Sequence, residues 1–300
     1  MALMTKQSIS VVFPAHNEEG NIAKAVEQAI HCLEHLSPDW EIIPVNDGSS
    51  DNTGEIIQGL SRQYSRVKGV HHEANRGYGA ALKSGIQSAS KELIFFCDSD
   101  LQFHLYELLH LLIWIEQFDL VIGYRAKRND RLHRVVNAFG WKVLVSNLLG
   151  LKVRDIDCAF KLFRRVVFQA IEIDAVGAMV NTDILVQASR MGFKIKEVPV
   201  THFPRVEGEQ SGARLRVIAK AFRELLILYR KLRNIHPIVL DFDRRRTTEA
   251  VAVEKRILED RRKVMMPINF PDRRRRFLLL DGVEVPMSTA AGPERGFHGE

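Results

Sequence analysis

Short apolar runs alternate with helical patterns over the first 125 residues. Five of these runs have the length and apolar content of strands: Ile9–Ala15, Glu41–Val45, Val67–His71, Leu93–Cys97 and Leu120–Gly123. Between them, apolar residues recur every three or four positions, which predicts four helices: Asn21–Leu36, Thr53–Tyr64, Gly79–Ala89 and Tyr106–Glu116. This β-α-β-α order predicts an α/β fold, a mostly parallel sheet with helices on both faces.

The pattern changes after Arg125. It predicts two strand-like segments and three helices there: Asp155–Phe163 (a strand, or a loop that returns to the sheet), Ile195–His202, and the helices Arg131–Leu149, Thr182–Met191 and Leu215–Arg233. From about His236 the chain is rich in arginine and is interrupted by prolines. Only two weak helical or strand patches are visible there: Glu249–Lys263 and Phe277–Val285.

Composition narrows the class of protein. The three cysteines, Cys32, Cys97 and Cys158, form no CxxC pair, which disfavours a disulfide framework or a zinc site and makes a reducing cytoplasm the default. No apolar leader stands at Met1–Ser8, and the most apolar segment, Leu108–Ile115, is too short to span a membrane. The net charge is +6 with clustered arginines, which fits an anionic membrane or nucleic-acid partner, or simply a solvated basic tail.

Polar motifs follow the first, second and fourth predicted strands. Because ligands bind at the carboxyl ends of parallel strands, these motifs are expected to converge on one edge of the sheet. The first motif, Pro14–Glu19, suits close approach by a ligand, although Asn17 could equally cap a helix. The second, Asn46–Thr53, places Asp47 where it could bind ribose or a base, although Asp51 or Thr53 could again be a cap.

Two further motifs carry the chemistry of phosphates and metals. Asn75–Ala81 opens a helix with two glycines beside an arginine, which suits either a phosphate-approach loop or a tight turn. Asp98-Ser99-Asp100-Leu101-Gln102 directly follows the apolar strand Leu93–Cys97. Two carboxylates and an amide oxygen are hard ligands of the kind that Mg²⁺ or Mn²⁺ accepts, and a capping role does not explain the whole arrangement.

In this order the four motifs resemble family 2 glycosyltransferases of the GT-A type, and most of all the dolichol-phosphate mannosyltransferase-like branch. The resemblance covers about Ser8–Arg233. It implies a Rossmann-like GT-A sheet in which Asp98, Asp100 and Gln102 hold the metal and diphosphate. The side chains expected to line the nucleotide sugar are Pro14, Ala15, His16, Asn17, Glu18, Asp47, Asn75, Arg76, Gly77, Lys83, Asp98, Ser99, Arg205 and Ser211.

Downstream motifs resemble the acceptor side of the same family. Gly123-Tyr124-Arg125 is similar to an element whose arginine faces the acceptor phosphate, and Arg134 is a second candidate for that anion. Asp155–Lys161 is similar to a segment that points Asp157 into the sugar pocket, and Pro204–Ser211 to a loop that closes on the donor. Three details depart from the pattern: Asn46 where many relatives have Asp, Ala159 in place of glycine, and one extra residue before Ser211.

The resemblance implies an inverting transfer of a hexose from a nucleoside diphosphate sugar, such as GDP-mannose or a UDP-hexose, to a polyprenyl phosphate. Arg125 and Arg134 would position the acceptor, which is already anionic and needs positioning more than a general base. If a saccharide or glycerolipid hydroxyl were the acceptor, Asp157 would be the base. A nucleotidyltransferase is disfavoured because Pro14–Glu18 is not a glycine-rich loop, and a non-enzymatic basic binding module leaves Asp98 and Asp100 unexplained.

The predicted helix Leu215–Arg233 has one apolar stripe flanked by basic residues, which suits either a membrane interface or packing on the core. We expect a catalytic domain over residues 1–212, this amphipathic helix over 213–235, and a basic C-terminal extension over 236–300. The expected location is the cytoplasmic face of a membrane, reached peripherally or through a membrane-protein partner or homo-oligomer, with no nucleic acid involved.

Overall fold

The computed structural model describes residues 5–126, 140, 144–177, 179–204, 215–232, 277–280 and 283–286, and of 215–223 and the last two segments it describes the backbone alone. The chain divides into two compact units, Met1–Phe242 and Asp243–Glu300. In the second unit, strands β8 (Phe277–Leu280) and β9 (Val283–Pro286) pair as an antiparallel hairpin.

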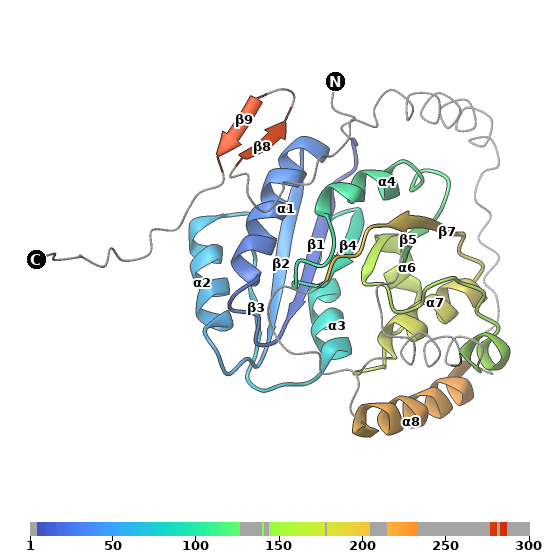
Figure 1. Cartoon of the computed structure of the whole chain (residues 1–300). Coiled ribbons are helices and arrows are strands. Elements are labelled where there is room, and N and C mark those ends of the chain that lie inside the picture. The colour runs from blue at the N-terminus through green and yellow to red at the C-terminus, as the bar shows by residue number, and fades with distance from the viewer. Residues whose placement is uncertain are drawn as a thin grey trace, which may run out of the picture. The chain divides into compact units, whose positions relative to one another are not determined.

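A seven-stranded sheet forms the centre of the first unit, with the order β3-β2-β1-β4-β6-β5-β7 (Figure 1). Its strands are β1 (Ile9–Ala15), β2 (Trp40–Asp47), β3 (Val70–His72), β4 (Leu93–Cys97), β5 (Leu120–Arg125), β6 (Phe160–Arg164) and β7 (Ile195–Val200). All neighbouring pairs are parallel except those of β6, which runs antiparallel to both β4 and β5. The predicted mostly parallel α/β fold is confirmed.

Helices cover both faces of this sheet (Figure 1). They are α1 (Ile22–Leu36), α2 (Thr53–Gln63), α3 (Tyr78–Ser88), the 3₁₀ turn η1 (Leu105–Glu107), α4 (Leu108–Leu112), α6 (Arg165–Ala170), α7 (Val180–Arg190) and α8 (Leu215–Leu232). One buried cluster joins β1 residues such as Val11 and Phe13 to α1, α2 and α4. A second cluster joins Val12, on the opposite face of β1, to α3, α6, α7 and α8. The alternation along β1 therefore places one core on each side of the sheet.

One predicted helix differs from the structure. The helix expected over Tyr106–Glu116 is a 3₁₀ turn followed by the short α4, and after α4 the Trp114 N–H bonds to Leu111 O (3.1 Å), an i→i−3 pattern that tightens the chain. The segment Asp155–Phe163 is a loop that returns to the sheet as strand β6 at Phe160, which is the second of the two predicted alternatives. Most of the predicted helix Arg131–Leu149 lies outside the described residues. Its described C-terminal part, 144–149, is helical.

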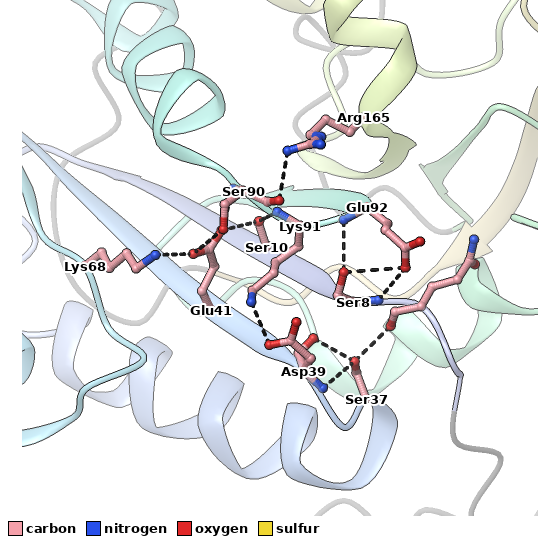
Figure 2. Close-up of polar contacts among 11 residues, drawn as sticks. Ser8, Ser10, Ser37, Asp39, Glu41, Lys68, Ser90, Lys91, Glu92 and Arg165 are labelled. Atoms are coloured by element: carbon pink, nitrogen blue, oxygen red, sulfur yellow. Dashed lines mark hydrogen bonds and ion pairs between the residues drawn. The ribbon is translucent and has the colours of Figure 1, made fainter.

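The parallel strands begin on one side of the sheet, called the amino edge below. There, a network of hydrogen bonds and ion pairs links the starts of β1, β2 and β4 (Figure 2). Its centre is Glu41, 1% exposed, whose carboxylate accepts from the Ser10 hydroxyl (2.6 Å), the Lys68 ammonium (2.7 Å) and the Ser90 backbone N–H (2.6 Å). Burial acts to raise the pKa of Glu41, but these hydrogen bonds outweigh it and lower the pKa to about 2. This buried carboxylate is thus fully provided with donors.

No helix among the residues that the structure describes combines the length and apolarity needed to cross a membrane.

Candidate functional site

The C-terminal ends of the parallel strands lie on one side of the sheet, called the carboxyl edge below. There, hydrogen bonds join the loop after β1 to the loop after β2. The backbone N–H of Asn17 donates to the Ser49 hydroxyl (3.0 Å), and Asn17 Oδ1 accepts from the backbone N–H of Ser50 (2.9 Å). Asn17 has a φ of +56°, a left-handed conformation in which asparagine is enriched. It does not cap the next helix, because α1 begins after Asn21. The structure thus gives Asn17 the role of shaping this edge.

The other first-motif candidates differ in how far they reach the surface. Pro14 and Ala15 end the buried strand β1, whereas His16 is exposed and Glu18 is half-buried. The Glu18 carboxylate accepts from Asn21 Nδ2 (2.8 Å), which holds it against the start of α1. His16 and Glu18 are therefore the two side chains of this set that a ligand at the edge could touch.

Asp47 joins the second motif to the third. It is buried, and its carboxylate accepts from the backbone N–H groups of Arg76 (3.0 Å) and Gly77 (2.8 Å). His72 Nδ1 lies 2.7 Å from Asp47 Oδ1, and His72 Nε2 lies 2.9 Å from the Ser84 hydroxyl. These contacts orient the loop before α3, so Asp47 organises this part of the edge in addition to its predicted role beside the nucleotide.

The glycines that open α3 meet another segment of the chain. The carbonyl of Val176 accepts from the backbone N–H groups of Gly79 (3.0 Å) and Ala80 (3.3 Å). A Cβ atom on Gly79 would lie 2.3 Å from the Ala175 carbonyl oxygen, and Gly77 has a φ of +100°. Close backbone approach and a tight turn therefore account for both glycines, the second of the two interpretations that the sequence allowed.

Lys83, a predicted nucleotide-sugar contact, also binds this segment. Its ammonium donates to the carbonyl of Ile173 (2.7 Å), which fastens α3 to the chain after α6. Asn75 and Arg76, by contrast, have exposed side chains. Of the third-motif candidates, these two are placed where an approaching anion could reach them.

Asp98, Ser99 and Asp100 lie at the end of β4 with little access to solvent. The Ser99 hydroxyl donates to the Pro14 carbonyl (3.0 Å), which fixes the acidic turn against the end of β1. Burial, and then the negative charge of Asp100, raise the pKa of Asp98 to about 7, while the nearby Tyr78 hydroxyl acts in the opposite direction. Burial and Asp98 likewise raise the pKa of Tyr78 well above its usual range. The Asp98 carboxyl group is therefore harder to ionise than that of an ordinary aspartate.

Gln102 connects this acidic turn to the chain after β7. Its backbone N–H donates to Asp100 Oδ1 (3.2 Å), and its side-chain Nε2 donates to the carbonyl of Phe203 (2.8 Å). Leu101 between them has a φ of +60°, a strained conformation for a leucine and one that often marks a functional turn. Because Nε2 is engaged, Oε1 is the side-chain atom that could face a cation.

The donor set fits a divalent cation that is shared with a ligand. Among the described residues, no group of three or more His, Cys, Asp or Glu side chains is arranged to hold a metal ion on its own. Asp98 and Asp100 nonetheless repel one another in a buried setting, which a divalent cation would relieve. Both supply hard oxygen ligands, and a Mg²⁺-type ion held by one or two carboxylates normally takes further oxygens from phosphates and water.

On the predicted acceptor side, Arg125 is held by a buried acid. Its Nε and Nη2 donate to the two carboxylate oxygens of Asp155 (2.7 and 2.9 Å), and its backbone N–H donates to the same group (3.3 Å). Burial acts to lower the pKa of Arg125, but Asp155 outweighs it and raises the pKa. The guanidinium is therefore fixed in direction by one edge, and its remaining N–H groups lie on the other edge.

The remaining predicted site residues divide into two groups. Asp157 lies within the described residues and is exposed. It comes two residues after Asp155, the partner of Arg125. Arg134, Arg205 and Ser211 lie outside the described residues.

The sequence model of glycosyl transferase family 2 matches residues 10–172, which contain all four strand-end motifs and the Arg125–Asp155 pair. The chain belongs to glycosyl transferase family 2. The predicted family is thereby confirmed.

Curated relatives of this family 2 transferase include three that match about two thirds of the chain. The glycosyltransferase AglD of Haloferax volcanii is 31% identical over 66% of this chain and 33% of its own. A dolichyl-phosphate beta-glucosyltransferase of Trichomonas vaginalis is 31% identical over 64% of each chain. An undecaprenyl-phosphate 4-deoxy-4-formamido-L-arabinose transferase of Pectobacterium carotovorum is 28% identical over 71% of this chain and 64% of its own. The matched region thus spans less than two thirds of each relative.

Solved structures of glucosyl-3-phosphoglycerate synthase from Mycobacterium tuberculosis share the fold. One, in complex with Mn²⁺, UDP and phosphoglyceric acid, has a TM-score of 0.60 at 22% identity and covers 76% of this chain and 79% of its own. Another, with Mn²⁺, UDP and glucosyl-3-phosphoglycerate, has a TM-score of 0.55 at 21% identity, covering 75% and 77%. The predicted GT-A fold of the family 2 transferase is confirmed by this likeness.

Sequence reasoning missed four side chains of this edge. The sequence patterns assign no role to Tyr78, His72 or Lys161, and they do not identify Asp155 as the partner of Arg125. Lys161 carries the one sequence signal that could have revealed it: a lysine between aromatic and aliphatic residues in Phe160–Arg164 is unusual for a buried strand. The other three depend on contacts between distant segments.

Proposed function

We propose that this family 2 transferase moves a hexose from a nucleoside diphosphate sugar to a polyprenyl phosphate, with inversion at the anomeric carbon. The observation that carries the proposal is the acidic turn at the end of β4, where Asp98 and Asp100 lie close together with little solvent. The names of two curated relatives, a dolichyl-phosphate and an undecaprenyl-phosphate transferase, support the acceptor class.

On the donor side, we assign Asp98, Asp100 and the Oε1 atom of Gln102 to a Mg²⁺ or Mn²⁺ ion. When bound, such an ion neutralises the diphosphate that departs with the nucleoside. The protein supplies the frame for it: Ser99 fixes the acidic turn on β1, and Asp47 fixes the loop that carries Arg76. The exposed first-motif side chain His16 and the half-buried Glu18 are assigned to the nucleotide.

On the acceptor side, we assign Arg125 to the phosphate of the lipid, with Arg134 as a second cation. Asp155 holds the Arg125 guanidinium by one edge (2.7 and 2.9 Å), which pre-orients its other edge for an anion. A phosphate monoester is already anionic, so orientation towards the anomeric carbon matters more than removal of a proton. A competing assignment uses a saccharide or glycerolipid hydroxyl as acceptor and the exposed Asp157 as its base.

Incubation of the protein with labelled UDP- and GDP-sugars, Mn²⁺ or Mg²⁺, and a polyprenyl phosphate tests the proposal. We expect labelled sugar in the lipid extract, and almost none with Asp100→Ala. Labelled sugar found only in a water-soluble oligosaccharide would overturn the phosphate acceptor and favour the hydroxyl assignment. Undiminished turnover by Asp100→Ala would overturn the metal assignment.

We further propose that the chain is peripheral on the cytoplasmic face of a membrane and that α8, the helix beyond a catalytic domain over residues 1–212, touches the lipid. In α8, Leu225, Leu228 and Leu232 are buried against the core, whereas Leu226 and Ile227 are 58% and 55% exposed. Its last turn also carries basic residues, which favour an anionic surface.

Flotation with anionic vesicles tests this second proposal. The double variant Leu226→Glu/Ile227→Glu is expected to lose vesicle binding. Val166→Glu is the matched control, since Val166 is an exposed apolar residue of α6 (36% exposed) and is expected to retain binding. Equal flotation of the two variants would contradict the role of α8.

A further inference from the structure

Lys161 is an ammonium group buried at the centre of the sheet. It lies in β6, paired with Phe96 of β4 and Ile122 of β5, and it is 0% exposed. Burial lowers its pKa, because a cation is poorly solvated there. Such a charge is costly in a core unless its donors are satisfied, so its partners explain why the position carries a lysine.

Three oxygen atoms accept from the Lys161 ammonium. They are the carbonyl of Ile156 (3.0 Å), the carbonyl of Cys158 and the Oδ1 atom of Asn181 in α7 (3.0 Å). The ammonium also lies 5.6 Å from the centre of the Phe96 ring. All three N–H groups of the lysine are therefore used, and two of them bind the backbone of one turn.

That turn is the one that carries the acceptor-side acids. Ile156 and Cys158, whose carbonyls accept from Lys161, flank Asp157 in the chain. Asp155, which accepts from Arg125, directly precedes Ile156. The side chain of Asp157 is exposed, while the carbonyls of its two neighbours in the chain accept from Lys161. The position of Asp157 and the direction of Arg125 thus both depend on a backbone that Lys161 fixes.

The charge of Lys161 also faces acids from both halves of the edge. The negative charges of Asp155 and Asp157 in the turn, and of Asp98 at the end of β4, act to raise the pKa of Lys161 against the effect of burial. A neutral side chain of similar length, such as methionine, would fill the same volume but would leave two carbonyls and the Asn181 oxygen without their donor. Packing alone therefore does not account for this residue.

We propose that Lys161 is a positioning residue for glycosyl transfer: it fixes the turn 155–158 and so aligns Asp157 and the Arg125–Asp155 pair with the donor half of the site. The role rests on the proposed function for its effect on turnover, but not for its effect on the turn. It acts through the backbone and does not itself touch the substrate.

Lys161→Met tests this role, with Lys68→Met as the matched control. Lys68 bonds to Glu41 at the opposite edge of the sheet, so its variant makes the same chemical change away from the site. Amide hydrogen exchange and steady-state kinetics are measured on folded samples of both. We expect exchange in 151–160 to rise at least about tenfold in Lys161→Met. We expect turnover to fall about 10- to 100-fold with an almost unchanged KM for the donor, as misalignment predicts.

Two results would overturn the proposal: exchange in 151–160 equal to that of Lys68→Met, or a rise of the donor KM in step with the loss of turnover. If Lys161→Met does not fold, Asn181→Ala removes one of the three acceptors and is expected to move both readouts in the same direction by a smaller factor. A wild-type protein that transfers no sugar to polyprenyl phosphate would refute the proposed function alone, because the exchange comparison would still decide the role of Lys161.

Discussion

Glu41 and Asp98 lie at opposite edges of the sheet, and their surroundings shift the pKa of the two carboxyl groups in opposite directions. At the amino edge, Glu41 receives hydrogen bonds from Ser10, Lys68 and Ser90, and its pKa falls to about 2 (Figure 2). At the carboxyl edge, burial and Asp100 raise the pKa of Asp98 to about 7. One acid is stabilised in its charged form by the fold, whereas the other is held charged at neutral pH only at a cost.

The difference separates structural polarity from functional polarity within one sheet. A buried acid that the protein has neutralised needs nothing further, and its removal harms the fold. A carboxyl group whose pKa is raised by burial and by a neighbouring acid is typical of a site that binds a ligand, and the ligand that we propose for Asp98 and Asp100 is a divalent cation with a diphosphate. We therefore expect that removing the charge of Asp98 lowers activity, whereas removing the charge of Glu41 lowers stability.

The largest expected effect is the loss of activity on neutralising the carboxyl edge. Asp98→Asn and Asp100→Asn each keep the shape of the side chain but remove a charged ligand. We expect turnover to fall by about 10²–10³-fold, the size seen when one electrostatic contact to a transition state is removed. Lipid-linked product formation at saturating Mn²⁺ measures it.

Asp39→Asn is the control for that experiment. Asp39 is an exposed acid of the amino edge that pairs with Lys91 (2.6 Å), so its variant changes the net charge equally without touching the site. It is expected to have wild-type turnover. If Asp39→Asn and Asp98→Asn lost activity alike, the contrast between the edges would be an effect of net charge.

Much of the carboxyl edge follows from sequence because strand ends are encoded locally. Apolar runs such as Leu93–Cys97 define where a strand stops, and Asp98 comes next along the chain. Parallel pairing then brings the residues after β1, β2 and β4 to one side, which is why the order of the four motifs along the chain is enough to group them.

What sequence could not supply are contacts between segments that are distant along the chain. The carbonyl of Val176 accepts from the N–H of Gly79, which lies 97 residues earlier in the chain, and no local sequence pattern indicates this contact. The same holds for the pairing of Arg125 with Asp155 and for the antiparallel direction of β6. Such contacts depend on how the second half of the chain returns to the sheet.

The next effect in size is a loss of stability at the amino edge. Glu41→Gln removes a buried charge that accepts from Lys68, Ser10 and Ser90, and we expect the free energy of unfolding to fall by about 2–4 kcal/mol at pH 7. Turnover per folded molecule is expected to stay at the wild-type level. Urea unfolding followed by circular dichroism measures the stability, and lipid-linked product formation measures the turnover.

Its pH dependence has a defined sign. The pKa of Glu41 is about 2 in the folded state and near 4.5 in the unfolded state, so the stabilisation is complete above about 4.5 and is lost as the pH falls to about 2. The difference between wild type and Glu41→Gln should therefore shrink over that window. A difference that stayed constant from pH 7 to pH 3 would contradict the network as its source.

The smallest expected effect is on stability at Asp98, and its sign is opposite to that at Glu41. The pKa of Asp98 is about 7 when folded and near 3.8 when unfolded, so the folded protein binds this proton more tightly. Stability should fall as the pH rises from about 4 to 7, and without metal Asp98→Asn should be more stable than wild type above pH 7, by on the order of 1–3 kcal/mol. Below about pH 3 the two should unfold alike, because Asp98 is then almost fully protonated in both states. Added Mn²⁺ should shrink or reverse the difference, since an ion that binds only the folded wild-type site stabilises only that protein. Melting temperatures across pH, with and without Mn²⁺, measure both statements. Asp98→Asn less stable than wild type without metal at pH 8 would mean that Asp98 resembles Glu41, and the contrast between the two edges would then be lost.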